Sequence, residues 1–267
     1  MTKPENFKTV VFPVSRIATV DIGGVGFGKH HMKALVELDV TDACEKLAWL
    51  KQQGEKISFN SWLIKCISET INKHKMMHGI RSGKRKVVIF DDIDISVMVE
   101  RDIEGVKVPL PYVIRKTNIK DFREINREIE AAKEQSIKGD GNYVLGNNKK
   151  SLLMKLYYSL PGPARRLSWK LILRNPNLVK KNMGTVMVTS VGMIGDVKGW
   201  FIPVSVHPLC FVIGSIEKKP GIASGRIEVR EYLYLTALVD HDVVDGAPAI
   251  RALNDLKELV ETGYGLS

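Results

Sequence analysis

The stretch VDHDVVDGA, residues 239–247, brings a histidine to the end of a β-type run late in the chain. Apolar and β-branched residues precede it, so the sequence predicts a strand from which His241 emerges at a position fixed by the backbone. Asp245 and Gly246 follow directly before a helix expected over 248–261, and glycine lets the chain turn sharply there. A rigidly held imidazole can accept a proton from a substrate. The spacing alone nevertheless favours a structural histidine, because HxxxDG fixes only three of six positions.

Hydrophobic periodicity predicts a mixture of strands and helices along the rest of the chain. Strands are expected over 34–40, 86–90, 93–99, 106–114, 184–191, 210–216 and 226–239. Helices are expected from Thr41 or Asp42 to about residue 53 and over 58–75, 121–138 and 248–261. The prolines in 106–114 favour an edge strand. The last helix is expected to bury Ile250 together with Leu253 and Leu256. Because strands and helices do not alternate regularly, a doubly wound parallel sheet is not expected.

Two further motifs have ordinary structural interpretations. The glycine-dense stretch 21–28 lacks the Lys-Ser/Thr pair of a phosphate-binding loop and precedes a strand, so it is interpreted as a flexible turn. His74 and His78 would share one face of a helix, but no zincin glutamate lies between them and no third ligand is apparent. We therefore expect no metal site there and a helix end that reaches solvent.

The composition predicts one domain spanning residues 1–267. Hydrophobic residues make up 44% of the chain, enough for a core of ordinary depth, and no Pro- or Ser-rich linker divides it. The opening sequence MTKPEN has no apolar segment typical of a signal peptide, and no apolar run approaches the length of a membrane span. Three scattered cysteines without a CxxC pair indicate neither a disulfide framework nor a thiolate metal site. A cytoplasmic location is expected.

The formal net charge of +10 is concentrated in one segment of the chain. Residues 141–195 contain no aspartate or glutamate. Nine basic residues lie in this segment: Lys149, Lys150, Lys155, Arg165, Arg166, Lys170, Arg174, Lys180 and Lys181. Since the rest of the chain is close to neutral, no nucleic-acid partner is expected. Two short amphipathic segments, 151–160 and 163–174, are predicted within this basic stretch.

The stretch 239–247 resembles the active-site motif of the dihydrolipoyl acyltransferases of 2-oxo acid dehydrogenase complexes. Other segments agree with that family in order and spacing: 37–41, 56–59, 63–65, 105–115, 184–192, 202–204 and 207–208. Apart from the basic stretch, the resemblance covers nearly all of residues 10–263. It implies the fold of chloramphenicol acetyltransferase, an α/β (α+β) two-layer sandwich in which a mixed sheet packs against helices and which forms trimers.

The resemblance implies a coenzyme A-dependent acyltransferase with His241 as the general base. In such enzymes this histidine takes a proton from the thiol of coenzyme A or dihydrolipoamide, and the thiolate attacks a thioester carbonyl. The aspartate of the motif, here Asp245, is structural and pairs with an arginine near the N-terminus, which Arg16 matches. Gly246 supports the turn. Such a charge-assisted bond would hold the histidine loop in place.

Three hydroxyl-bearing residues match family positions that contact substrate. Thr189 stands where the family has a serine that donates to the oxyanion of the tetrahedral intermediate. Ser190 replaces an asparagine, and Ser58 matches a serine that contacts coenzyme A. No lipoyl domain and no peripheral-subunit-binding domain are expected in this chain, and so no covalently bound lipoyl group. No metal is expected either.

The resemblance also implies a homotrimer with active sites between subunits, either alone or joined into larger assemblies. The family's first helix is expected to be replaced by the glycine-rich turn. The segment at about 139–182 is interpreted as a basic helical insertion with three readings: a solvated cover, a dock for an acidic carrier protein or a lipoyl domain in trans, or a membrane-surface contact through leucines, Tyr157, Tyr158 and Trp169.

Two other functions remain open beside the enzyme. A non-catalytic trimeric scaffold would keep the fold without its chemistry, and a membrane-surface assembly protein would act through the basic insertion. Retention of His241, Asp245 and a hydroxyl at Thr189 favours the enzyme, since packing requires none of them.

Overall fold

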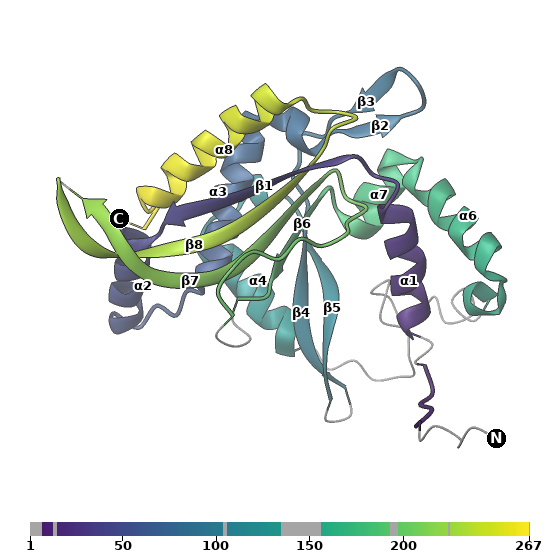
Figure 1. Cartoon of the computed structure of the whole chain (residues 1–267), viewed down its shortest axis with the longest axis horizontal. Coiled ribbons are helices and arrows are strands. Elements are labelled where there is room, and N and C mark those ends of the chain that lie inside the picture. The colour runs from purple at the N-terminus through teal and green to yellow at the C-terminus, as the bar shows by residue number, and fades with distance from the viewer. Residues whose placement is uncertain are drawn as a thin grey trace, which may run out of the picture.

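The protein is built on one mixed six-stranded sheet, as the computed structural model shows for residues 7–12, 15–103, 106–134, 156–192, 197–223 and 225–266 (Figure 1). The strands run in the order β1-β8-β7-β6-β4-β5. Their bounds are β1 His31–Asp39, β4 Ile95–Ile103, β5 Val106–Ile114, β6 Val186–Ser190, β7 Leu209–Ala223 and β8 Arg226–Asp240. The β4–β6 and β6–β7 pairs are parallel and the others are antiparallel. The mixed sheet and the edge position of β5 were both predicted correctly.

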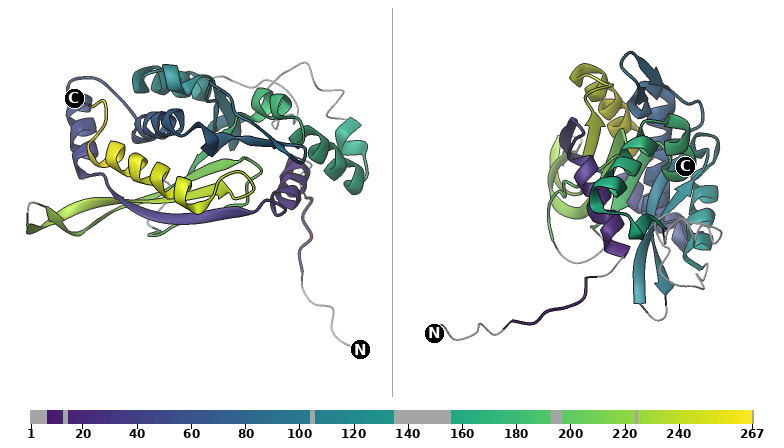
Figure 2. Two further views of the ribbon diagram at one scale, coloured as in Figure 1. Left: turned by 90° about the horizontal axis from the view of Figure 1, so that it is seen from above. Right: turned by 90° about the vertical axis from the view of Figure 1, so that its right-hand side faces the viewer.

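Helices α2 Thr41–Gln52, α3 Phe59–Lys73, α4 Phe122–Glu134 and α8 Gly246–Glu261 supply the core on one face of this sheet and give two layers (Figure 2). The other helices are α1 Ser15–Gly26, α6 Gly162–Leu173 and α7 Pro176–Met183, with α6 packed against both α1 and α7. A separate two-stranded hairpin, β2 Ile80–Ser82 and β3 Lys86–Val88, projects beside the end of β8. No helix in the described ranges is both long and apolar enough to cross a membrane.

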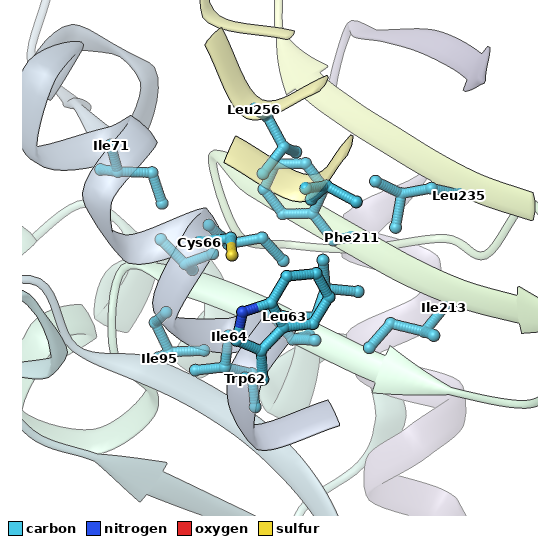
Figure 3. Close-up of a cluster of buried hydrophobic side chains, with 14 of the residues drawn as sticks. Trp62, Leu63, Ile64, Cys66, Ile71, Ile95, Phe211, Ile213, Leu235 and Leu256 are labelled. Atoms are coloured by element: carbon cyan, nitrogen blue, oxygen red, sulfur yellow. The ribbon is translucent and has the colours of Figure 1, made fainter. Parts of the chain in front are cut away.

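The core lies between the sheet and α3, the most deeply buried helix (Figure 3). Trp62 and Leu63 are fully buried, and the Trp62 indole Nε1 donates to the carbonyl oxygen of Tyr264 at 2.8 Å. Burying each large side chain of this kind stabilises the fold by about 1.5–3 kcal/mol. The helix begins where the Ser58 hydroxyl accepts from the backbone N–H of Ser61, an N-cap. Apolar spacing and a capping serine together explain why this helix was predictable.

The glycine-rich stretch forms the end of helix α1, so the predicted turn is wrong. Glycine in a helix interior costs about 1 kcal/mol relative to alanine. At Gly26 close packing accounts for it, since a Cβ there would lie 2.7 Å from Val204 Cγ1 and 3.1 Å from the Ser205 carbonyl oxygen. Asp21 on the same helix is only 5% exposed and is bonded to side chains of the basic insertion. Tertiary contacts therefore override the local preference for a turn.

The basic insertion is anchored to α1 by a buried polar cluster. Arg165 Nε lies 2.7 Å from Asp21 Oδ2, and the Tyr157 hydroxyl donates to the same oxygen at 2.8 Å. Trp169 is 4% exposed, and its Nε1 donates to the Tyr157 hydroxyl at 2.8 Å. The Tyr158 hydroxyl is also buried. These aromatic side chains point inward, so of the side chains in the membrane interpretation it is the leucines, among them Leu156, Leu167 and Leu171, that are exposed.

The predicted insertion helix over 163–174 is confirmed as α6, whereas α7 was not anticipated. Most of the first predicted segment, 151–155 of 151–160, lies outside the described residues.

Three smaller predictions are corrected by packing and hydrogen bonding. Ile250 is 56% exposed, because α8 turns it away from the sheet. His78 is fully buried, with its Nδ1 2.8 Å from the Thr185 hydroxyl, so this helix end does not reach solvent there. The start of α2 is held by the Asp39 carboxylate, which accepts from the N–H and the hydroxyl of Thr41. The capping group therefore precedes the predicted one.

Candidate functional site

His241 emerges from β8, as predicted, and its side chain is half-exposed. Its backbone N–H donates to the carbonyl oxygen of His30 at 2.9 Å, which fixes the loop against the residues that lead into β1. The imidazole is 51% exposed, and its Nδ1 lies 3.8 Å from an Asp245 carboxylate oxygen. Asp245 is 86% exposed, so this pairing is weak in water. The imidazole is thus held through its backbone and is open to an incoming molecule.

The loop that carries His241, residues 240–245, is clamped by the residues that lead into β1. Lys29 Nζ lies 2.6 Å from Asp240 Oδ2, and the Asp240 side chain is only 2% exposed. His30 Nδ1 lies 2.9 Å from Asp242 Oδ1. The other Asp240 carboxylate oxygen accepts from the Asp242 N–H at 3.2 Å. Two neighbouring residues before β1 therefore fix both neighbours of His241.

A second contact to this loop comes from the β2–β3 hairpin. Arg81 Nη1 lies 3.3 Å from Asp242 Oδ2. At the base of the hairpin, a Cβ on Gly79 would lie 3.2 Å from Val243 Cγ1 and 2.8 Å from Val87 Cγ1. A larger residue would force the Val87 side chain to shift, so glycine permits this close approach. The hairpin and the His241 loop form one packed unit.

The predicted ion pair between Arg16 and Asp245 is not formed within one chain. In the described ranges, the ion partner recorded for Asp245 is His241, and no contact joins Asp245 to Arg16. Arg16 lies on α1, which packs against the insertion helix α6. The buried pair of Lys29 and Asp240 holds the loop instead. A charge pattern in the sequence could suggest Lys29, but only the β1–β8 register brings it to Asp240.

Thr189 and Ser190 lie at the far end of β6 from His241. Thr189 is level with Val212 on β7, which is level with Thr236 on β8. His241 lies five positions beyond Thr236, about 16 Å further along β8. In addition, β6 and β8 are separated by two strand spacings of about 4.8 Å each. The two side chains are therefore too far apart to act together within one subunit. The Ser190 hydroxyl is buried without a hydrogen-bond partner in the described part of the chain.

Ser58 has a structural role at the start of α3. Besides accepting from the Ser61 N–H at 3.1 Å, its hydroxyl lies 2.6 Å from the Ser61 hydroxyl. Its own N–H donates to the Asn126 side-chain oxygen at 3.0 Å. These bonds fix its hydroxyl in the helix cap.

The burial of His207 and His78 was missed by sequence reasoning. His31 Nε2 donates to the carbonyl oxygen of His207 at 2.9 Å, and His207 Nε2 donates to that of Met183 at 3.1 Å. Burial lowers the pKa of His207 to about 4 and that of His78 also to about 4, because the charged imidazolium loses its hydration. His74 pairs with Asp255 at 2.5 Å. Within the described ranges, no three His, Cys, Asp or Glu side chains gather in a way that could hold a metal ion.

Comparison with known proteins matches most of the chain to one family. Residues 29–141 and 175–266 match 2-oxoacid dehydrogenases acyltransferase (catalytic domain), and the match omits the segment that contains α6. A dihydrolipoyllysine-residue succinyltransferase component of the mitochondrial 2-oxoglutarate dehydrogenase complex, from Bos taurus, is 24% identical over 84% of this chain and 42% of its own length. The chain spans about half the length of the first curated relatives it matches.

Two solved structures share the fold. A probable dihydrolipoamide acetyltransferase from Listeria monocytogenes 4b F2365 has a TM-score of 0.69 at 20% identity, covering 97% of this chain and 96% of that one. Chloramphenicol acetyltransferase has a TM-score of 0.50 at 12% identity, covering 92% and 94%. The predicted chloramphenicol acetyltransferase-like fold is therefore confirmed.

Acid should destabilise the fold through His207 and His78. Both are neutral in the folded protein down to about pH 4 but would take up protons near 6.5 once unfolded. Between pH 4 and pH 6.5 the unfolded state therefore binds more protons than the folded state. The free energy of unfolding is highest above about pH 6.5 and falls as the pH drops, by up to about 1.4 kcal/mol per pH unit for each histidine. Urea unfolding at fixed protein concentration across this range measures the slope. His207→Gln should flatten it, and an unchanged slope would contradict the assignment.

Removing Lys29 should destabilise the protein because it leaves the Asp240 carboxylate nearly buried and unpaired. We expect Lys29→Met to lower the free energy of unfolding by about 2–4 kcal/mol. Lys180→Met is a matched control, since Lys180 pairs with the equally buried Asp94 at 2.8 Å, but Asp94 keeps Arg115 at 2.9 Å. The control should lose about 1 kcal/mol. If denaturant unfolding showed equal losses of unfolding free energy for the two variants, the buried Asp240 carboxylate would not depend on Lys29 to compensate its charge.

Proposed function

Because this chain belongs to the family of 2-oxoacid dehydrogenase acyltransferase catalytic domains, we propose that it moves an acyl group between a thioester and a thiol, with coenzyme A as one partner. The half-exposed imidazole of His241, held by its backbone in a clamped loop, carries the proposal. A base must be reachable by substrate and yet fixed in position. A scaffold would need neither property.

In the proposed reaction His241 takes the proton of the acceptor thiol. The thiolate sulfur attacks the carbonyl carbon of the donor thioester, and a tetrahedral intermediate with a negatively charged oxygen forms. When this intermediate collapses, the carbon–sulfur bond of the donor breaks, and the leaving thiolate takes the proton back from His241. The acyl group has then changed sulfur, and no other reactant is consumed.

The charged oxygen of the intermediate needs a hydrogen-bond donor, and we assign this role to the Thr189 hydroxyl. Losing such a donor generally raises the barrier by about 2.7–4 kcal/mol. Since Thr189 and His241 of one chain are far apart along the sheet, the donor must come from a neighbouring subunit. This separation supports a homotrimer in which each active site lies between two subunits. Ser190 follows Thr189 in β6, so its side chain points to the opposite face of the sheet, and its hydroxyl is buried and unpartnered in the described chain.

The partner that brings the acyl group is proposed to be an acidic carrier, such as a lipoyl domain supplied in trans. Arg166 and Lys170 on α6 and Arg174 at its C-cap recur every four residues, are exposed, and have no acidic partner in the described chain. Arg165 is excluded from this surface because it anchors α6 to Asp21. The inward aromatic residues favour the carrier over a membrane, since interfacial helices commonly present such rings to lipid.

The intersubunit site can be tested by mixing two inactive variants. His241→Ala and Thr189→Val should each lower acyl transfer at least about a hundredfold. When both subunits are co-expressed, some interfaces combine an intact histidine with an intact threonine, so random assembly should restore about a quarter of the wild-type activity.

The control for this mixing experiment co-expresses His241→Ala with the double variant His241→Ala/Thr189→Val, which offers no intact interface. No recovery in the first mixture would place the two residues outside a shared intersubunit site. Wild-type turnover by His241→Ala alone would show that His241 is not the base, and a wild-type protein without any acyl transfer would leave the trimeric scaffold as the better function.

Charge on α6 should affect encounter with a carrier-bound donor rather than chemistry. The triple variant Arg166→Gln/Lys170→Gln/Arg174→Gln should lower the second-order rate with an acidic carrier about tenfold at low salt, because steering is screened over about 10 Å at 0.1 M. Turnover with a small soluble thioester should not change. The charge-matched control is Lys51→Gln/Arg127→Gln/Arg226→Gln, three exposed residues on other elements. Equal losses with both donors would contradict docking, and lost liposome binding without a kinetic effect would favour the membrane.

A further inference from the structure

The β2–β3 hairpin carries a dense positive charge next to the His241 loop. Four of the six residues from 81 to 86 are basic, and none is acidic. Lys84, Arg85 and Lys86 are exposed, and no ion pair or hydrogen bond of their side chains is recorded among the described residues. Gly83 has a φ of +67°, which allows the tight turn that brings these side chains together.

The nearest acidic side chain on the His241 loop cannot neutralise this hairpin. Asp242 accepts from Arg81, but it is already bound to His30, and these contacts lower the pKa of its carboxyl group. One carboxylate is therefore shared between two bases, and the three charges at the turn remain uncompensated. Like charges held this close repel one another. An anionic ligand would relieve that repulsion.

We infer that the hairpin binds the phosphate groups of a thiol substrate of the coenzyme A type. The inference rests on the proposed function, because it needs a thiol delivered to His241. Arg81 lies beside the residue that follows His241, and the turn extends about 10 Å further, at roughly 3.3 Å per residue. The pantetheine arm of coenzyme A likewise separates its thiol from its phosphates. Arginine and lysine side chains suit phosphate oxygens as charge-assisted donors.

The folded position of the hairpin supports this role over that of a solvated loop. The hairpin is outside the main sheet, so its charges are not needed for strand pairing there. Its base packs on Val243 of the His241 loop through Gly79. A ligand bound at the turn is thereby linked to the site through a rigid contact, and the thiol end is directed at the loop.

Equilibrium binding tests the inference independently of catalysis. Calorimetric titration should show that the wild-type protein binds coenzyme A more tightly than dephospho-coenzyme A, and both more tightly than pantetheine. In Lys84→Gln/Arg85→Gln/Lys86→Gln the affinity for coenzyme A should fall about tenfold, the combined effect of three exposed charge contacts, with pantetheine binding unchanged. The preference should also shrink in high salt. The control Lys51→Gln/Arg127→Gln/Arg226→Gln should bind as the wild type does.

Kinetics with the same variants separates this inference from the proposed reaction. The hairpin variant should raise KM for coenzyme A about tenfold with kcat kept, and should leave acyl transfer to pantetheine unchanged. Equal affinity of the wild type for coenzyme A and pantetheine, or equal losses for both in the hairpin variant, would overturn the inference. Phosphate-dependent binding without any acyl transfer would contradict the proposed function but keep the hairpin as a phosphate site. Tighter retention of a carrier-linked phosphopantetheine than of coenzyme A would identify the carrier as the phosphate source.

Discussion

The ion pair between Lys29 and Asp240 determines where the candidate base stands. It closes the end of the β1–β8 ladder, in which His31 is level with Asp240 and Asp39 with Tyr232. Because the Asp240 carboxylate is nearly buried, leaving it unpaired would be unfavourable, and the loop has little freedom to move. The catalytic proposal and the hairpin proposal both depend on this fixed loop. The stability of the fold and the geometry of the site therefore share one interaction.

Features set by local sequence were predictable. The strand exit at His241, the capped α3 and the insertion helix α6 all follow from periodicity and capping over a few residues. Pairings across the chain were not. Lys29 and Asp240 are separated by 211 positions, and nothing in the spacing distinguishes that lysine from Arg16 as the partner of the loop. The family resemblance predicted that Arg16 would pair with the His241 loop, whereas the β1–β8 register places Lys29 next to it.

Burial was the other property that the sequence left open. Glycines near residue 24 indicated a turn, yet the helix persists because Gly26 packs closely on Val204 and α1 is tied down through Asp21. The same carboxylate turns Tyr157 inward and, through it, orders Trp169. An amphipathic pattern shows that a helix has an apolar face, but it does not show whether a neighbouring helix covers that face. Here α1 covers the aromatic face of α6 and leaves its basic face exposed.

The positive charge of the chain consequently divides into neutralised and free groups. Lys180 and Arg115 are paired with Asp94, and Arg165 is paired with Asp21, so these bases stabilise the fold. Two clusters of free groups stand out in the described part of the chain, one on the outer face of α6 and one at the turn of the β2–β3 hairpin. Of these two clusters, the hairpin is the one that contacts the His241 loop, through Arg81. A charge remote from the site can act on the rate of encounter, while a charge fixed to the loop can also orient the bound substrate. The two surfaces are therefore suited to successive steps of one reaction.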